Sequence, residues 1–144
     1  MPKPLWIVVA NGSRARILQR DPPHEALREI KEWVHPQTRQ HTPPGEGRHR
    51  TSGMRSRSGL AQRETAQDHA RAQFAREISH WLDHQMPVSQ VSSLALFASN
   101  PFLGELLAQG NGAMRRHVQV SHALDLTQLP VAELDARLQR DYGL

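Results

Sequence analysis

Residues 5–19 read LWIVVANGSRARILQ, and this stretch decides the fold. Its first six residues form an unbroken apolar run rich in β-branched side chains, which predicts a strand covered on both faces. Asn11-Gly12 is a strong hairpin signal because both residues tolerate positive φ. We therefore expect a second strand over residues 14–19, in which apolar residues alternate with arginines.

The clearest helix is predicted at residues 64–86, where apolar side chains recur every three or four positions until Pro87. Thr65 and Asp68 fit a capping box at its start, although the pattern also allows an earlier start. Further strands are predicted at residues 91–98 and 117–121, and further helices at 102–109 and 130–140. Residues 27–34 fit one face of a helix as well as a strand; we choose a third strand because the segment is short and His35-Pro36 requires an extended exit. A hairpin-led sheet followed by alternating helices and strands indicates an α/β fold with one mixed sheet and helices packed on it.

Length and composition limit the possible number of domains, metal sites and membrane segments. With 144 residues, the chain suits one domain over residues 1–144. It has no cysteine, which excludes disulfides and thiolate metal sites. The apolar run near the N-terminus is too short for a signal-peptide core or a membrane span. We therefore expect a cytoplasmic protein.

Residues 36–63 form the most unusual segment, because they contain six arginines and only one acidic residue, Glu46. The few apolar side chains here cannot offset roughly 1–2 kcal/mol of backbone ordering per residue, so we expect a mobile basic loop. A solvated, tolerated insertion is the simpler reading, but the charge favours an anionic partner. The candidate nucleic-acid-binding residues are Arg39, Arg48, Arg50, Arg55, Arg57 and Arg63.

The sequence does not specify an enzyme. It contains no GxSxG elbow and no glycine-rich phosphate loop, and no strand carries the carboxylates of a magnesium nuclease. His80 and His84 have a spacing that can hold zinc, but a solvated helix face explains them better. Asn100 follows a buried strand, where ligands often bind, yet an ordinary turn and helix cap explain it better. No metal, cofactor or catalytic residue is predicted.

Several separated motifs between Trp6 and about Leu138 resemble a bacterial family described as proteins required for attachment to host cells. The resemblance rests on WIVVANGSRAR (6–16), HPQTR (35–39), GR (47–48), FA (74–75) with Ile78 and Leu82, PFLGEL (101–106), and LDLT (124–127) with Pro130. The family more often has Asp where this chain has Asn11. The family name describes a phenotype and no chemistry.

The resemblance implies a fold similar to the middle domain of archaeal and eukaryotic peptide-chain release factors, which is ribonuclease-H-like. In those proteins a loop before a long helix carries Gly-Gly-Gln into the ribosome, and the basic segment has the corresponding place here. It has no Gly-Gly-Gln, so peptidyl-tRNA hydrolysis is not implied. The leading hypothesis is a non-catalytic module that binds ribosomal or other structured RNA. The alternatives are a cell-surface interaction protein and an RNA-directed hydrolase, the latter without an identifiable nucleophile or metal site.

Overall fold

A five-stranded sheet in the order β3-β2-β1-β4-β5 forms the centre of the computed structural model. The structure describes residues 3–35, 53–91, 93–110 and 112–144, with residues 53–64 described as backbone. Its elements are β1 (Leu5–Ala10), β2 (Arg14–Arg20), β3 (Arg28–Val34), α3 (Gly53–Val88), β4 (Ser93–Ala98), α4 (Phe102–Gln109), α5 (Ala113–His117), β5 (Val118–His122) and α6 (Val131–Tyr142). The predicted α/β class with a hairpin-led mixed sheet is confirmed.

The sheet is mixed because two kinds of connection build it. β1, β2 and β3 are joined by short connections and pair antiparallel. β4 and β5 follow helices and pair parallel, β4 with β1 and β5 with β4. Antiparallel neighbours need only a tight turn, whereas parallel neighbours need a crossover, which helices provide here. The hairpin predicted at Asn11-Gly12 is confirmed, with Leu5 opposite Arg20 and Ala10 opposite Ala15. Neither turn residue has the positive φ on which the prediction was based, so that part of the prediction is wrong.

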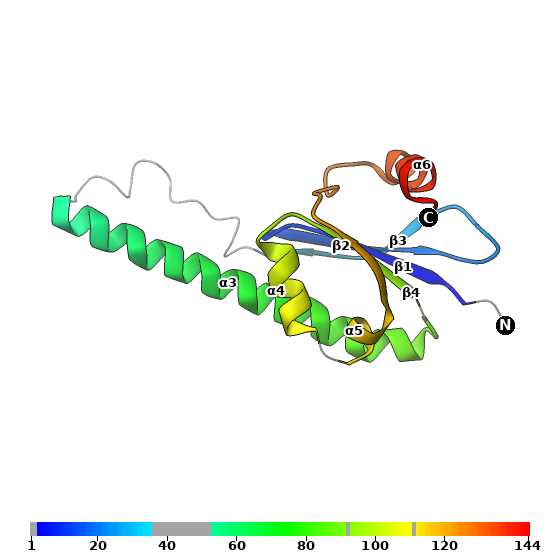
Figure 1. Ribbon diagram of the computed structural model, residues 1–144, viewed down its shortest axis with the longest axis horizontal. Helices are drawn as coiled ribbons and strands as arrows, with labels where there is room; N and C mark the ends of the chain where they lie inside the picture. The colour runs from blue at the N-terminus through cyan, green and yellow to red at the C-terminus, as the bar shows by residue number, and fades with distance from the viewer. Residues whose placement is uncertain (1–2, 36–52, 92, 111) are drawn as a thin grey trace.

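Helices cover both faces of the sheet, as Figure 1 shows, with α3, α4 and α5 on one face and α6 on the other. β1 supplies both cores, since its side chains point alternately to opposite faces. Trp6 and Val8 pack in the cluster that includes α3, and Ile7 and Val9 pack with Leu134 of α6. The expectation that this apolar run is covered on both faces is therefore confirmed.

The long helix α3 begins much earlier than predicted. It starts at Gly53, and its 36 residues span about 54 Å. The prediction of a loop up to Arg63 is therefore wrong for residues 53–63, and Thr65 lies inside the helix instead of at its start. Extending an existing helix costs far less than nucleating one, and the segment's Met, Arg, Leu, Ala and Gln are good helix formers. The rest of the predicted loop, residues 36–52, lies outside the described residues.

Among the described side chains of α3, those that pack in the core lie in its C-terminal half. Residues 65–69 of α3 are exposed, and Ala70 is the first residue of this helix that is described as buried. Further along, Trp81 stacks on Trp6 with ring centroids 5.3 Å apart. Figure 1 shows the N-terminal half extending past the end of the sheet. Residues 53–69 thus carry the chain about 25 Å beyond the core.

Candidate functional site

The turn after β1 is held by the side-chain amide of Asn11. Its Oδ1 accepts hydrogen bonds from the backbone N–H groups of Ser13 and Arg14, each at 2.9 Å. Its Nδ2 donates to Asp125 Oδ2 at 3.0 Å and to Thr127 Oγ1 at 3.1 Å. One side chain therefore shapes the hairpin turn and fixes it to a segment more than 110 residues away.

The neighbours of position 11 favour an amide there over a carboxylate. Asp125 accepts from the backbone N–H and the hydroxyl of Thr127, at 2.9 and 2.6 Å. Burial opposes its ionisation, but the hydrogen bonds from Thr127 and Asn11 and the charge of Arg14 prevail and lower the pKa of Asp125 below its ordinary value. An ionised Asp125 needs a donor opposite it, which an amide provides and a second carboxylate does not. In this chain Asn11 has a structural role.

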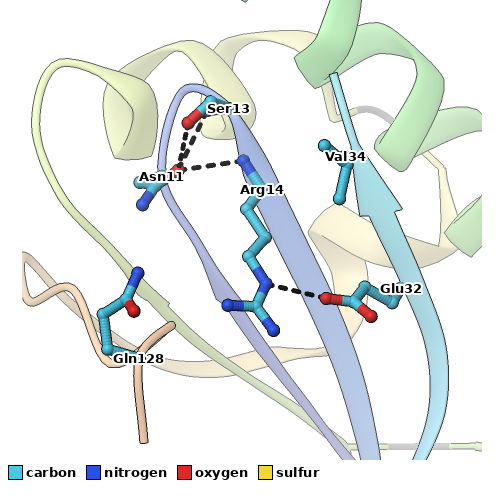
Figure 2. Close-up of a pocket in the computed structure, with 6 residues that line it drawn as sticks. All are labelled: Asn11, Ser13, Arg14, Glu32, Val34 and Gln128. Atoms are coloured by element: carbon cyan, nitrogen blue, oxygen red, sulfur yellow. Dashed lines mark hydrogen bonds and ion pairs between the residues drawn. The ribbon is translucent and has the colours of Figure 1, made fainter. Parts of the chain in front are cut away.

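A pocket of about 320 Å³ opens beside this turn, lined by Asn11, Ser13, Arg14, Glu32, Val34 and Gln128. The Nε of Arg14 donates to Glu32 Oε2 at 2.7 Å. In Figure 2 the guanidinium of Arg14 lies between Glu32 and Gln128, and one of its terminal nitrogens points away from Glu32. Neither terminal nitrogen bonds to another residue in the described part of the chain. Val34, 45 % exposed, adds an apolar wall.

Two other arginines of β2 are almost fully buried. Arg16 is 4 % exposed; it donates to the carbonyl oxygens of Thr127 (3.1 Å) and Leu129 (2.7 Å) and pairs with Glu29 at 2.7 Å. Its side chain binds the same C-terminal segment that Asn11 holds. The guanidinium thus donates hydrogen bonds to two carbonyl oxygens that lie outside the strands and helices.

Arg20 repeats this arrangement at the other end of the strand. It donates to the carbonyl oxygens of Leu144 and Glu25 at 2.6 and 2.7 Å, and it pairs with Asp135 of α6 at 2.6 Å. Burial opposes ionisation of Asp135, but hydrogen bonds from Arg20, the Leu27 N–H and Gln139 lower its pKa to about 2. Residues 125–144 are therefore fastened to the sheet by two buried guanidinium groups.

The structure places the six candidate nucleic-acid-binding arginines in two groups. Arg55, Arg57 and Arg63 lie on the part of α3 that extends past the sheet, and not in a loop as predicted. Arg39, Arg48 and Arg50 lie outside the described residues. The first group therefore lies on a helix, which the sequence did not predict.

The histidine pair on α3 has neighbours that favour a structural reading. The rings of His80 and His84 lie 4.4 Å apart, and the Asp83 carboxylate accepts the Met114 N–H at 2.9 Å. In the described part of the chain, no three His, Cys, Asp or Glu side chains could jointly hold a metal ion. Within the same residues, none of the helices has the length and apolar character required to cross a membrane.

Comparison with known proteins identifies the family. A family model described as "Protein required for attachment to host cells" matches residues 6–138. The chain belongs to this family. No curated protein matches the sequence. The family was suggested by the motifs of the sequence and is confirmed.

Solved structures show a similar fold at low sequence identity. One is titled "Archaeal protein"; it is 11 % identical, with a TM-score of 0.51 over 96 % of this chain and 34 % of its own. A Ppx/GppA family member from Aquifex aeolicus is 12 % identical, covers 100 % of this chain and 34 % of its own, and has a TM-score of only 0.31. The chain thus spans about a third of the length of either. The first likeness supports the α/β fold alone; a ribonuclease-H-like arrangement stays a prediction.

Sequence reasoning missed the pocket and the buried arginines. Arg14 and Arg16 alternate with apolar residues, a pattern that usually marks a solvated strand face. One signal was available: Arg14, Arg16 and Arg20 have even residue numbers in one strand and therefore point to the same face of the sheet. Burying several guanidinium groups on one face costs free energy unless hydrogen-bond acceptors lie opposite them. Some of those acceptors are Glu32, Glu29 and Glu25, which follow β2 closely in the sequence. The other acceptors of Arg16 and Arg20 come from residues 127–144, and no local pattern connects them to β2.

Proposed function

We propose that this protein is a non-catalytic, release-factor-like module that binds ribosomal or other structured RNA in the cytoplasm. The residues proposed to contact RNA phosphates are Arg39, Arg48, Arg50, Arg55, Arg57 and Arg63. The observation that carries the proposal is the position of α3, whose N-terminal half takes residues 53–63 of the basic stretch away from the sheet.

The physical argument combines charge with geometry. Residues 36–63 contain six arginines against one carboxylate, so the segment attracts a polyanion although the whole chain has a net charge of only +4. A guanidinium pairs with phosphate oxygens through two parallel hydrogen bonds. A projecting helix can reach a phosphate backbone without disturbing the packed half of α3, where Ala70 and Phe74 are buried. RNA binding of this kind needs no metal and no nucleophile.

Co-sedimentation of the purified protein with ribosomes tests the proposal. We compare wild type with Arg55→Ala/Arg57→Ala/Arg63→Ala across a salt series. The matched control is Arg28→Ala/Arg116→Ala/Arg140→Ala, which removes the same charge from exposed arginines on three other elements. We expect saturable, salt-sensitive binding that the first variant weakens and the control retains. Equal ribosome binding by the two variants would show that the arginines of α3 do not contact the ribosome. Absence of ribosome binding by the wild-type protein at low salt would contradict the proposed function itself.

The family description favours a second candidate, a protein that acts in attachment at the cell surface. This function requires the protein to reach the outside of the cell. Detection of the protein outside intact cells, with ribosome binding absent, would favour it over the RNA-binding proposal.

A further inference from the structure

The pocket beside the first hairpin has a chemistry that differs from that of a phosphate site. Its two charged lining residues, Arg14 and Glu32, carry opposite charges and are paired at 2.7 Å. Asp125, which is ionised and within hydrogen-bond distance of Asn11, adds a negative charge close by. A phosphate or carboxylate would therefore gain little here. A neutral ligand rich in hydrogen-bond acceptors suits the pocket better.

The two terminal nitrogens of the Arg14 guanidinium determine which hydrogen-bond acceptors of a ligand can bind in the pocket. Glu32 accepts a hydrogen bond from Nε, and neither terminal nitrogen has a hydrogen-bond partner among the described residues, so these two nitrogens form a planar pair of donors. Guanine presents O6 and N7 as a matching pair of acceptors. Adenine places an amino group beside N7, and that amino group would face the donors of Arg14. The pocket therefore distinguishes guanine from adenine by hydrogen bonding.

The remaining lining residues suit a planar ring. Val34 presents an exposed apolar surface for a ring face, and the Gln128 amide, on the opposite side in Figure 2, can donate or accept one further hydrogen bond. A volume of about 320 Å³ lies at the lower end of small-molecule sites, which run from roughly 300 to 1,000 Å³. One unpaired base fits this space, and a base-paired duplex does not.

From these observations we infer that the pocket of Arg14, Glu32, Val34 and Gln128 binds an unpaired guanine of an RNA. The inference deepens the proposed function and rests on it. Proteins that read RNA sequence commonly take up unstacked bases from loops, while phosphate contacts set the position. Val34 ends β3 directly before the basic segment, and Arg39 is five residues further along the sequence. Phosphate-binding and base-reading residues are thus neighbours in the chain.

A set of RNA hairpins differing at one loop position tests the inference by fluorescence anisotropy. We expect wild type to prefer guanine over adenine in the loop by roughly 5- to 150-fold, as one bidentate base contact allows. Arg14→Lys retains the charge but loses the planar fork, so the preference should fall close to one. Arg28→Lys, on β3 but outside the pocket, is the matched control and should keep the preference.

A titration with free guanosine, followed by amide NMR shifts, separates this inference from the proposed function. Guanosine carries no phosphate, so its binding does not depend on the arginines of α3. Shifts at Ser13, Arg14, Val34 and Gln128 without RNA binding would support the pocket and contradict the RNA-binding proposal. RNA binding with equal affinity for all four loop bases, and no guanosine shifts at these amides, would overturn the pocket assignment and leave the phosphate contacts standing. A peptide ligand would then be the alternative occupant.

Discussion

Arginine occurs in two different settings in this protein. On β2, Arg16 and Arg20 are each 4 % exposed and bind carbonyl oxygens and carboxylates of their own chain. On α3, Arg55, Arg57 and Arg63 belong to the helical stretch that precedes Ala70, the first residue of α3 that is described as buried. The second group lies on a part of the helix that extends past the sheet, where we propose that it meets a partner. The comparison shows that the number of arginines says little about function until their positions are known.

The largest expected effect is on stability, from Arg16→Ala. The substitution leaves the carbonyl groups of Thr127 and Leu129 without their donor and Glu29 without its cation. We expect the free energy of unfolding to fall by about 3 kcal/mol, measured by urea denaturation. Arg14→Ala is the control on the same strand; its ion pair is about one-third exposed and should contribute less than about 1 kcal/mol. Equal losses would contradict the anchoring role of Arg16.

Asp135→Asn tests the second anchor and should cost about 2 kcal/mol at neutral pH. The pKa of Asp135 is about 2 in the folded protein, below the ordinary value near 4. A lowered pKa stabilises the fold above pH 4, and this contribution is lost as the pH falls from about 4 to 2. Unfolding measured across that window should therefore show a shallower pH dependence in the variant than in wild type. If the unfolding free energies of wild type and variant changed equally with pH, ionisation of Asp135 would not contribute to stability through Arg20.

Asn11→Asp should have a smaller effect, about 1 to 2 kcal/mol at neutral pH. It replaces a donor with a second carboxylate at hydrogen-bond distance from Asp125. Two neighbouring carboxylates raise the apparent pKa of the pair, so the destabilisation should diminish as the pH falls and one proton binds. Thermal unfolding of the two proteins between pH 7 and pH 4 measures this. A constant difference over that range would mean that the two side chains do not interact.

The smallest expected effect is on stability, from Arg55→Ala/Arg57→Ala/Arg63→Ala. Alanine is the best helix former, and residues 53–69 lie outside the packed half of α3. Urea denaturation should place the variant within about 0.5 kcal/mol of wild type. A larger loss would show that this part of α3 also supports the fold, and the contrast between the two arginine groups would fail.

Most of the fold could be predicted because its signals are local. Apolar runs located β1 and β4, Asn11-Gly12 located the hairpin, and Pro130 and Gly143 bracketed α6. The start of α3 could not be located this way, because residues 53–63 look too polar and glycine-rich to fold alone. They are helical as an extension of a half that is already packed.

The candidate site was harder to predict for a different reason. Arg14, Glu32 and Gln128 meet only because antiparallel pairing and the return of residues 125–129 bring them together. Likewise, Arg16 and its two carbonyl acceptors are separated by more than 110 residues. Contacts over such distances depend on the complete fold, and a periodicity in one strand does not reveal them.

The salt dependence of RNA affinity tests the central claim most directly. Each phosphate contact on single-stranded RNA contributes about 0.7 to the slope of log affinity against log salt, and up to about 0.9 on a duplex. If Arg55, Arg57 and Arg63 each contact one phosphate, replacing all three with Ala should lower the slope by about 2, whereas the Arg28/Arg116/Arg140 control should leave it unchanged. Equal slopes for wild type and the α3 variant would contradict the claim that the projecting helix binds RNA.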